Sequence, residues 1–269
     1  MEDQKQQWIY QTVFLNEMDT DKYVSYIKKG YCVFDIKENY IDYFCSEFEC
    51  LYNQTKDNDF LYEYAHLLRK KEVKAEGDDV KHFQIMLSLA NQKYVKAYCS
   101  LGICYSDGYG VEQDSKKAYE YLSLAASQGY LVALNALGVL YYTGEYVKED
   151  KKKAFEIMLE CSKYGLAVSQ CNVAIAYFYG TYGELVPKDF DKAFYYASLS
   201  AEQGHRRALY VLGEMYYFGM GTNKDDDEAL YYFYKALIKG YEPARRYVNY
   251  LGTRSPLLYR NELWYKIDE

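Results

Sequence analysis

The sequence predicts an all-α solenoid, because one pattern recurs at a fixed period and proline is almost absent. The stretch from Ala97 to Ala133 returns three more times, at a period of 36 residues and once of 39. A fixed period in this range is typical of stacked helical repeats, in which each unit contacts only its neighbours. Three prolines among 269 residues suit long helices. We therefore predict a right-handed α/α superhelix of helix pairs.

Four residue types mark each repeat at fixed positions. A tyrosine lies three residues before a glycine, an aspartate follows that glycine, an alanine lies four residues later, and a second glycine closes the unit. The first glycine predicts the end of a helix A, and the aspartate predicts the N-cap of a helix B. In chain order, these five positions hold Tyr105, Tyr141, Tyr177 and Tyr216; Gly108, Gly144, Gly180 and Gly219; Asp114, Asp150, Asp189 and Asp225; Ala118, Ala154, Ala193 and Ala229; and Gly129, Gly165, Gly204 and Gly240.

Residues 1–60 precede the clear repeats, and we predict a helical cap or a decayed repeat there. Glu2–Asn16 fits a helix with an apolar end. Asp19 or Thr20 is the candidate N-cap of a second, short helix that ends at Gly30. Lys37–Leu51 carries apolar residues at helical spacing, which predicts a third helix.

The repeat region is predicted to span residues 61–252 and to end in a capping segment. It is divided into a degenerate repeat at 61–96, clear repeats at 97–132, 133–168, 169–207 and 208–243, and a half repeat at 244–252. In the degenerate repeat Arg69 replaces the tyrosine. The third clear repeat carries three extra residues in its turn at 180–188. In the capping segment, 253–269, Leu257–Ile267 is predicted to be helical, with Trp264 covering the last repeat.

Small residues are predicted to let the two helices of a repeat approach closely. Gly102, Gly138 and Gly213 occupy the same position of helix A, and Ala174 takes that position in the third clear repeat. A larger side chain there would overpack the joint between helices A and B.

The pattern A-x3-L-G-x2-Y-x2-G, followed by x5-D-x3-A and a closing glycine, resembles the Sel-like (Sel-one-like, SLR) repeat, a relative of the tetratricopeptide repeat. In the second clear repeat it is carried by Ala133, Leu137, Gly138, Tyr141, Gly144, Asp150, Ala154 and Gly165. The resemblance implies a right-handed α/α superhelix that acts as an adaptor or scaffold and is generally not an enzyme.

Charge and patterning disfavour several classes of protein. A net charge of −7 argues against a nucleic-acid binder, which usually carries a basic stripe. No stretch approaches 18 uncharged apolar residues, so we predict no membrane span. The N-terminus shows no apolar run after a basic start, so we expect no signal peptide, a cytoplasmic location and seven reduced cysteines.

We find no catalytic signature and predict no enzymatic activity, no cofactor and no metal site. His66, His82 and His205 are scattered along the chain and are predicted to serve packing or surface roles. Cys99 and Cys104 are five residues apart, which is not a spacing of zinc ligands.

The strongest signal for function is a predicted concave groove lined by helix A positions that are not needed for packing. The candidates are Asn135, Tyr142, Phe178, Tyr179, Tyr210, Glu214, Tyr217, Phe218, Arg246 and Tyr250. Tyrosine is enriched among interface hot spots, since its ring buries a large area with few rotatable bonds. Arg246 would meet an acidic group of the partner. The alternative is that these aromatic residues only pack against helix B.

The predicted function is therefore a non-enzymatic scaffold or adaptor that binds a partner protein or peptide in this groove. One alternative is a dedicated inhibitor, such as an immunity protein that occludes a toxin. A second is a protein that self-assembles through its end caps. A third is that residues 1–60 are an active module that the repeats only position. The sequence leaves the partner and the oligomeric state open.

Overall fold

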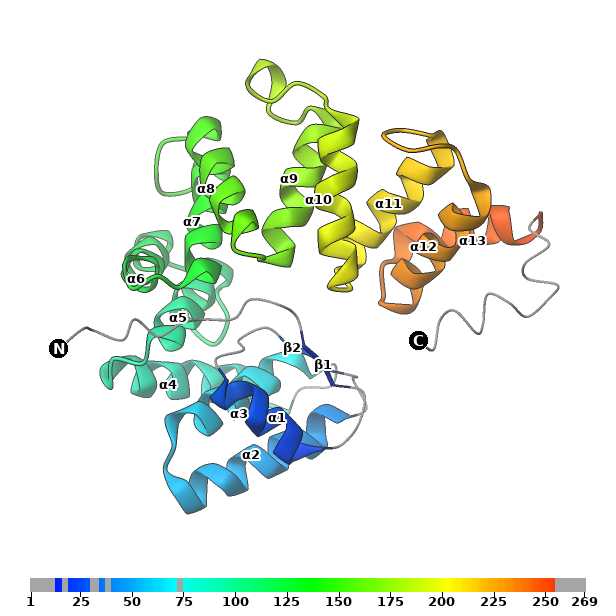
Figure 1. Cartoon of the computed structure of the whole chain (residues 1–269). Coiled ribbons are helices and arrows are strands. Elements are labelled where there is room, and N and C mark those ends of the chain that lie inside the picture. Colours follow the sequence, from blue (N-terminus) through cyan, green and yellow to red (C-terminus); the bar gives the residue numbers. More distant parts are fainter. Residues whose placement is uncertain (1–12, 16–18, 30–33, 37–39, 72–74, 255–269) are drawn as a thin grey trace. The chain divides into compact units, whose positions relative to one another are not determined.

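The computed structural model describes residues 13–15, 19–29, 34–36, 40–71 and 75–254, and the chain divides into two units, 1–157 and 158–269. Both units are built mainly from helix pairs (Figure 1). The predicted all-α class of repeated helix pairs is confirmed.

Unit 1 begins with a short pair of parallel strands, β1 (Val13–Leu15) and β2 (Phe34–Ile36), with Val13 opposite Phe34. The predicted helix over Glu2–Asn16 is wrong at Val13–Leu15, and residues 2–12 and 16 lie outside the described part. Consecutive β-branched and aromatic residues favour a strand once a second apolar segment supplies a partner. The helix α1 (Thr20–Lys28) connects the strands, as parallel pairing requires a crossover.

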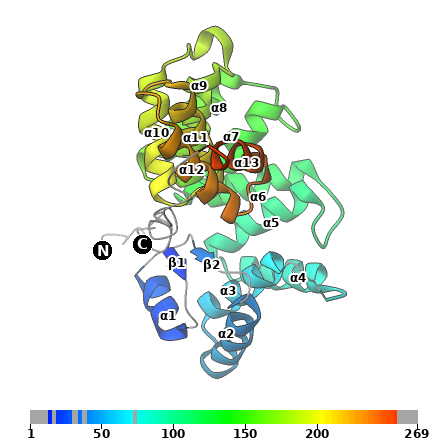
Figure 2. The same ribbon diagram turned by 90° about the vertical axis from the view of Figure 1, so that its right-hand side faces the viewer.

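The helices α1, α2 (Ile41–Thr55) and α3 (Asn58–Lys70) enclose an aromatic core. α2 and α3 lie side by side in Figures 1 and 2. Of the two predicted N-cap candidates, Asp19 caps α1, since its carboxylate accepts a 2.9 Å hydrogen bond from the backbone N–H of Lys22, and Thr20 is the first residue of the helix. The ring of Tyr23 meets Phe48 edge to face at 4.8 Å, and its hydroxyl donates to the buried carboxylate of Glu63 at 2.8 Å. Burial raises the pKa of Glu63.

The repeats of unit 1 contain α4 (Asp78–Asn91), α5 (Val95–Asp107), α6 (Ser115–Ser127) and α7 (Leu131–Thr143), and the division between the units falls within α8 (Lys151–Lys163). The predicted stop and start signals are confirmed. Gly108 ends α5 with a φ of 69°, which costs glycine little. Asp114 caps α6 by accepting a 3.0 Å hydrogen bond from the backbone N–H of Lys117.

Up to residue 254, where the described part ends, unit 2 continues the pattern with the end of α8 and five complete α-helices. They are α9 (Ala167–Tyr179), α10 (Phe190–Glu202), α11 (Arg206–Phe218), α12 (Asp226–Ile238) and α13 (Arg245–Gly252). The inserted turn at 180–188 forms a 3-10 helix, Gly183–Leu185, and a second 3-10 helix, Glu242–Ala244, leads into α13. The predicted helix over Leu257–Ile267 lies outside the described residues.

Glycines bring helices A and B together as predicted. A Cβ atom added at Gly213 would lie 2.7 Å from the ring of Phe233, and one added at Gly102 would lie 2.6 Å from Cγ of Leu122. Phe233 and Leu122 both lie eight residues after the capping aspartate of their helix B. In the third clear repeat that position holds Ala197, and the glycine is replaced by Ala174. The larger residue on helix A is thus matched by a smaller one on helix B.

Three of the repeat tyrosines are covered by lysines, a contact that was not predicted from the sequence. In the first three clear repeats, a lysine three residues after the capping aspartate places its Nζ atom over the tyrosine ring of helix A. This arrangement recurs as Lys117 over Tyr105 at 5.0 Å, Lys153 over Tyr141 at 3.9 Å and Lys192 over Tyr177 at 5.1 Å. Glu228 holds the lysine position in the last repeat. In these three repeats the aspartate therefore caps helix B, and the lysine three residues later covers the tyrosine ring of helix A.

Candidate partner-binding surface

A buried carboxylate connects two successive A helices of unit 2. Oε2 of Glu214, on α11, accepts a 2.6 Å hydrogen bond from the hydroxyl of Tyr179, on α9. Its other oxygen, Oε1, accepts a 2.9 Å hydrogen bond from the hydroxyl of Tyr210. Burial, together with the hydrogen bond to Glu214, raises the pKa of both tyrosines. Both hydroxyls thus remain protonated donors at neutral pH.

Arg246 extends this network to α13. Its Nη2 donates a 3.1 Å hydrogen bond to the hydroxyl of Tyr210, and its guanidinium lies 4.8 Å from the ring centre of Tyr247. The side chain of Arg246 is exposed, whereas Glu214 and Tyr210 beneath it are buried. The arginine is therefore held in a defined orientation at the surface.

Aromatic side chains continue the surface along α11 and α13. The ring of Tyr217 lies 4.9 Å from that of Phe218, 5.4 Å from Tyr247 and 6.5 Å from Tyr250. Phe218 is 50% exposed, Tyr250 45% and Tyr179 46%. We call this contact network the α11 surface, and it comprises Tyr179, Tyr210, Glu214, Tyr217, Phe218, Arg246, Tyr247 and Tyr250.

Two further cations flank the α11 surface. Nζ of Lys224 lies 5.5 Å from the ring centre of Tyr217, and the guanidinium of Arg254 lies 3.9 Å from that of Tyr250. Lys224, Arg254 and Tyr247 were not among the groove residues predicted from the sequence. The spacing of four residues from Arg246 to Tyr250 and from Tyr250 to Arg254 was the available signal, since such residues share one helix face.

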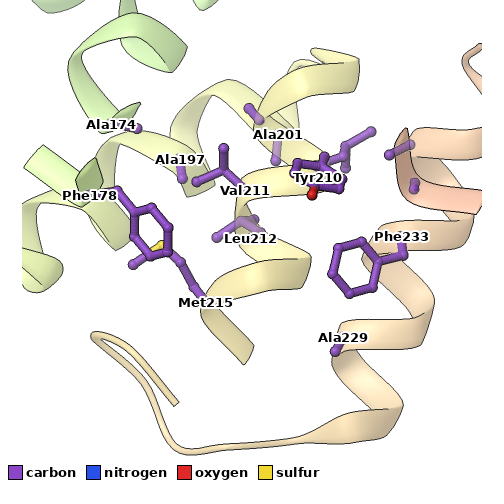
Figure 3. Close-up of a cluster of buried hydrophobic side chains, with 14 of the residues drawn as sticks. Ala174, Phe178, Ala197, Ala201, Tyr210, Val211, Leu212, Met215, Ala229 and Phe233 are labelled. Atoms are coloured by element: carbon purple, nitrogen blue, oxygen red, sulfur yellow. The ribbon is translucent and has the colours of Figure 1, made fainter. Parts of the chain in front are cut away.

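The other predicted groove residues lie elsewhere. Phe178 is 6% exposed and meets Phe190 of α10 edge to face at 5.8 Å. In Figure 3 its ring points toward Met215 inside the core of unit 2. This is the packing role against helix B that the sequence left open for these aromatic residues. Asn135, which is buried, and Tyr142, which is exposed, lie in unit 1. A groove lined by all ten residues stays a prediction.

Most of the histidine and cysteine side chains named here, which could in principle act in catalysis or metal binding, are buried. His82 is buried, and its Nδ1 lies 2.7 Å from the backbone oxygen of Ala65. Burial raises the pKa of the thiols of Cys161 and Cys171 to about 12. Among the described residues, no group of three or more His, Cys, Asp or Glu side chains is placed to hold a metal ion. In the same part of the chain, no helix has the length and apolar character needed to cross a bilayer.

Solved structures with the same fold come from several bacteria. A Sel1 repeat protein from Oxalobacter formigenes is 25% identical with a TM-score of 0.60, and the match covers 74% of this chain and 86% of that protein. A protective antigen of uropathogenic Escherichia coli strains displaying an SLR fold is 26% identical with a TM-score of 0.55. That match covers 74% of this chain and 42% of the antigen.

A putative Sel1 repeat protein from Klebsiella pneumoniae subsp. pneumoniae, 18% identical with a TM-score of 0.52, shows the fold alone. Its match covers 77% of this chain and 99% of that protein. A comparison with curated proteins finds no match. The family model for the Sel1 repeat matches residues 95–130, 131–159, 167–205 and 206–241, together more than half of the chain. The chain therefore belongs to the Sel1 repeat family.

Proposed function

We propose that this chain is a protein-interaction scaffold that binds its partner at the α11 surface. Proteins built from Sel1 repeats are generally non-enzymatic and bind other proteins. The observation that supports the site is the set of half-exposed rings of Tyr179, Phe218 and Tyr250 in unit 2. Grouped apolar side chains at a surface often mark an interaction site.

The buried network beneath these rings supports the same site. Tyr179 is fixed through Glu214, and Tyr250 is in contact with Tyr217. Rings that are already ordered before binding lose little conformational freedom in the complex, which leaves more of the contact free energy for affinity. A preorganised aromatic surface of this kind suits a partner that inserts apolar side chains between the rings.

The test compares two double variants with the wild type in affinity capture from a lysate of the source cells. Phe218→Ala/Tyr250→Ala removes two rings of the α11 surface. The matched control, Tyr164→Ala/Tyr195→Ala, removes two exposed rings elsewhere in unit 2, of which Tyr195 is 59% exposed. We expect a protein that is enriched by the wild type and the control and lost with the surface variant. Circular dichroism confirms that all three chains are folded.

If the surface variant retains the same partner, the α11 surface is not the site. The identity of the captured protein also separates two roles. An adaptor would bring a second protein with it, whereas an inhibitor would occlude a single toxin or effector and reduce its activity.

A further inference from the structure

We infer that the partner of the α11 surface presents an extended acidic segment, with two carboxylate side chains four residues apart and an apolar side chain between them. This inference rests on the proposed function above. It specifies the chemistry of the bound segment, which follows from the charges and the spacing around the surface.

The A helices of unit 2 differ in charge from the rest of the chain. Within α9, α11 and α13 the only carboxylate is Glu214, which is buried and accepts two tyrosine hydrogen bonds. The same helices carry the arginines Arg206, Arg207, Arg245 and Arg246. The whole chain has a net charge of −7. The positively charged side chains therefore stand out locally, and a surface of this sign complements an acidic partner.

Two arginines at the surface are available for a partner. Among the described residues, Arg246 and Arg254 form no ion pair, and both lie against tyrosine rings. The neighbouring Arg245 is different, since its Nε and Nη2 bond to Glu242 at 2.8 and 2.9 Å. Nη2 of Arg246 already donates to the hydroxyl of Tyr210, which leaves its Nε and Nη1 atoms to face a partner. A guanidinium can bind a carboxylate through two parallel hydrogen bonds.

The spacing of these residues fits an extended segment. Arg246, Tyr250 and Arg254 follow one another at intervals of four, and eight residues of helix rise by about 12 Å. Arg254 lies just beyond α13 and continues its last turn through a hydrogen bond to the oxygen of Leu251. In an extended chain, residues i, i+2 and i+4 point to one side and span about 13 Å. The two acidic residues would then face the arginines, while the middle residue faces Tyr250.

The rings of Tyr217, Phe218 and Tyr250 indicate that the middle residue of the bound segment is apolar. Tyr217 touches both Phe218 and Tyr250, so a side chain entering there meets ring carbon on more than one side. Single-stranded nucleic acid also combines negative charge with stacking groups. The net charge of −7 opposes a long polyanion, whereas a short segment with two carboxylates matches the two arginines.

The experiment selects binders from a phage-displayed library of random 12-residue peptides on the immobilised full-length chain. Selected peptides are synthesised with a fluorescent label, and their Kd is measured by fluorescence anisotropy. We expect acidic residues at i and i+4 with an apolar residue at i+2. Arg246→Gln and Arg254→Gln should each weaken binding about tenfold, because each removes a charge-assisted pair. Arg245→Gln, with the same change in net charge on the same helix, should alter binding less than about twofold.

Other outcomes separate the inference from the proposed function. Peptides that need Phe218 and Tyr250 but show no acidic pattern, and that bind Arg246→Gln as well as the wild type, overturn the inference alone. If no selected peptide needs Phe218 and Tyr250, the proposed function fails and the inference falls with it. A labelled 12-nucleotide oligothymidylate that binds more tightly than every peptide also overturns the inference. So does a dimer that dissociates in Arg246→Gln when measured by light scattering.

Discussion

The hydroxyl of Tyr179 donates a 2.6 Å hydrogen bond to Oε2 of Glu214, and so joins two A helices that are one repeat apart. The other carboxylate oxygen is occupied by Tyr210, so both acceptors face tyrosine donors. An amide at position 214 would keep one acceptor and turn an NH2 group toward a hydroxyl donor. We expect Glu214→Gln to lower the free energy of unfolding by about 1–3 kcal/mol, because a buried hydrogen bond is lost. Urea denaturation followed by circular dichroism measures this change.

Glu202→Gln is the matched control for that experiment. Glu202 is exposed on α10 in the same unit, and its neutralisation should change the free energy of unfolding by less than about 0.5 kcal/mol. Equal stabilities of the two variants would show that the carboxylate of Glu214 does not hold α9 and α11 together.

The loss of stability on substituting a helix A glycine should depend on how much space lies beside it. A Cβ at Gly213 would lie 2.7 Å from the Phe233 ring, whereas one at Gly138 would lie 3.1 Å from Cγ2 of Ile157. We expect Gly213→Ala to destabilise the chain by about 1–3 kcal/mol through overpacking. Gly138→Ala should cost less, and the gain in helix propensity offsets part of that cost. Thermal unfolding of both variants tests the order, which would be wrong if Gly138→Ala were the less stable one.

In the third clear repeat the helix A residue is larger and the helix B residue is smaller than in the other repeats. We therefore expect that a second substitution can compensate for the first at this pair of positions. Ala197 occupies the position that Leu122 and Phe233 hold in other repeats, and Ala174 replaces the glycine. We expect Ala197→Leu to cost about 1–3 kcal/mol, since Ala174 leaves it little room. Adding Ala174→Gly should restore part of this loss. A double-mutant cycle from urea denaturation, with Ala174→Gly alone as the fourth corner, gives a coupling free energy near zero if the two positions are independent.

We expect the free energy of unfolding to depend on pH through the imidazole of His205. Burial, followed by the nearby Arg206 and Arg207, lowers the pKa of this imidazole to about 4. The unfolded value is near 6.5. Below pH 6.5 the unfolded chain therefore binds a proton that the folded chain does not, and stability falls as the pH drops toward 4. We expect the loss in free energy of unfolding between pH 7.5 and pH 5 to be smaller in His205→Gln by about 1–2 kcal/mol.

The range from pH 7.5 to 8.5 serves as the internal control for His205. The imidazole is neutral in both states there, so wild type and His205→Gln should change in parallel. An equal loss at pH 5 in both chains would show that His205 contributes nothing to acid sensitivity. Urea titrations at the three pH values supply all of these comparisons.

The repeat helices were predictable because their signals are local. An aspartate that caps helix B and a glycine that ends helix A act within a few residues of themselves, as at Asp114 and Gly108. The pairing of Val13 with Phe34 depends on a partner 21 residues away, and no local pattern revealed it. A non-local partner decided strand over helix at that point.

The candidate surface was only partly predictable, because one step along a helix turns a side chain by about 100°. Phe178 and Tyr179 are adjacent, yet the first is buried and the second is 46% exposed. The sequence placed both in the groove, since both are aromatic. Tyr247 was overlooked although its ring stacks on Phe233 at 4.2 Å and carries the guanidinium of Arg246. Its role depends on contacts among three helices.

In unit 2 each helix packs mainly on its neighbours in sequence: α9 on α10, α10 on α11, α11 on α12 and α12 on α13. Closing the short turns between them costs little chain entropy. During synthesis, the ribosome releases helix A and helix B of a repeat one after the other. Each pair can then bury the contact between its helix A and its helix B before the next repeat has been translated, so the array can be assembled in the order in which it is made.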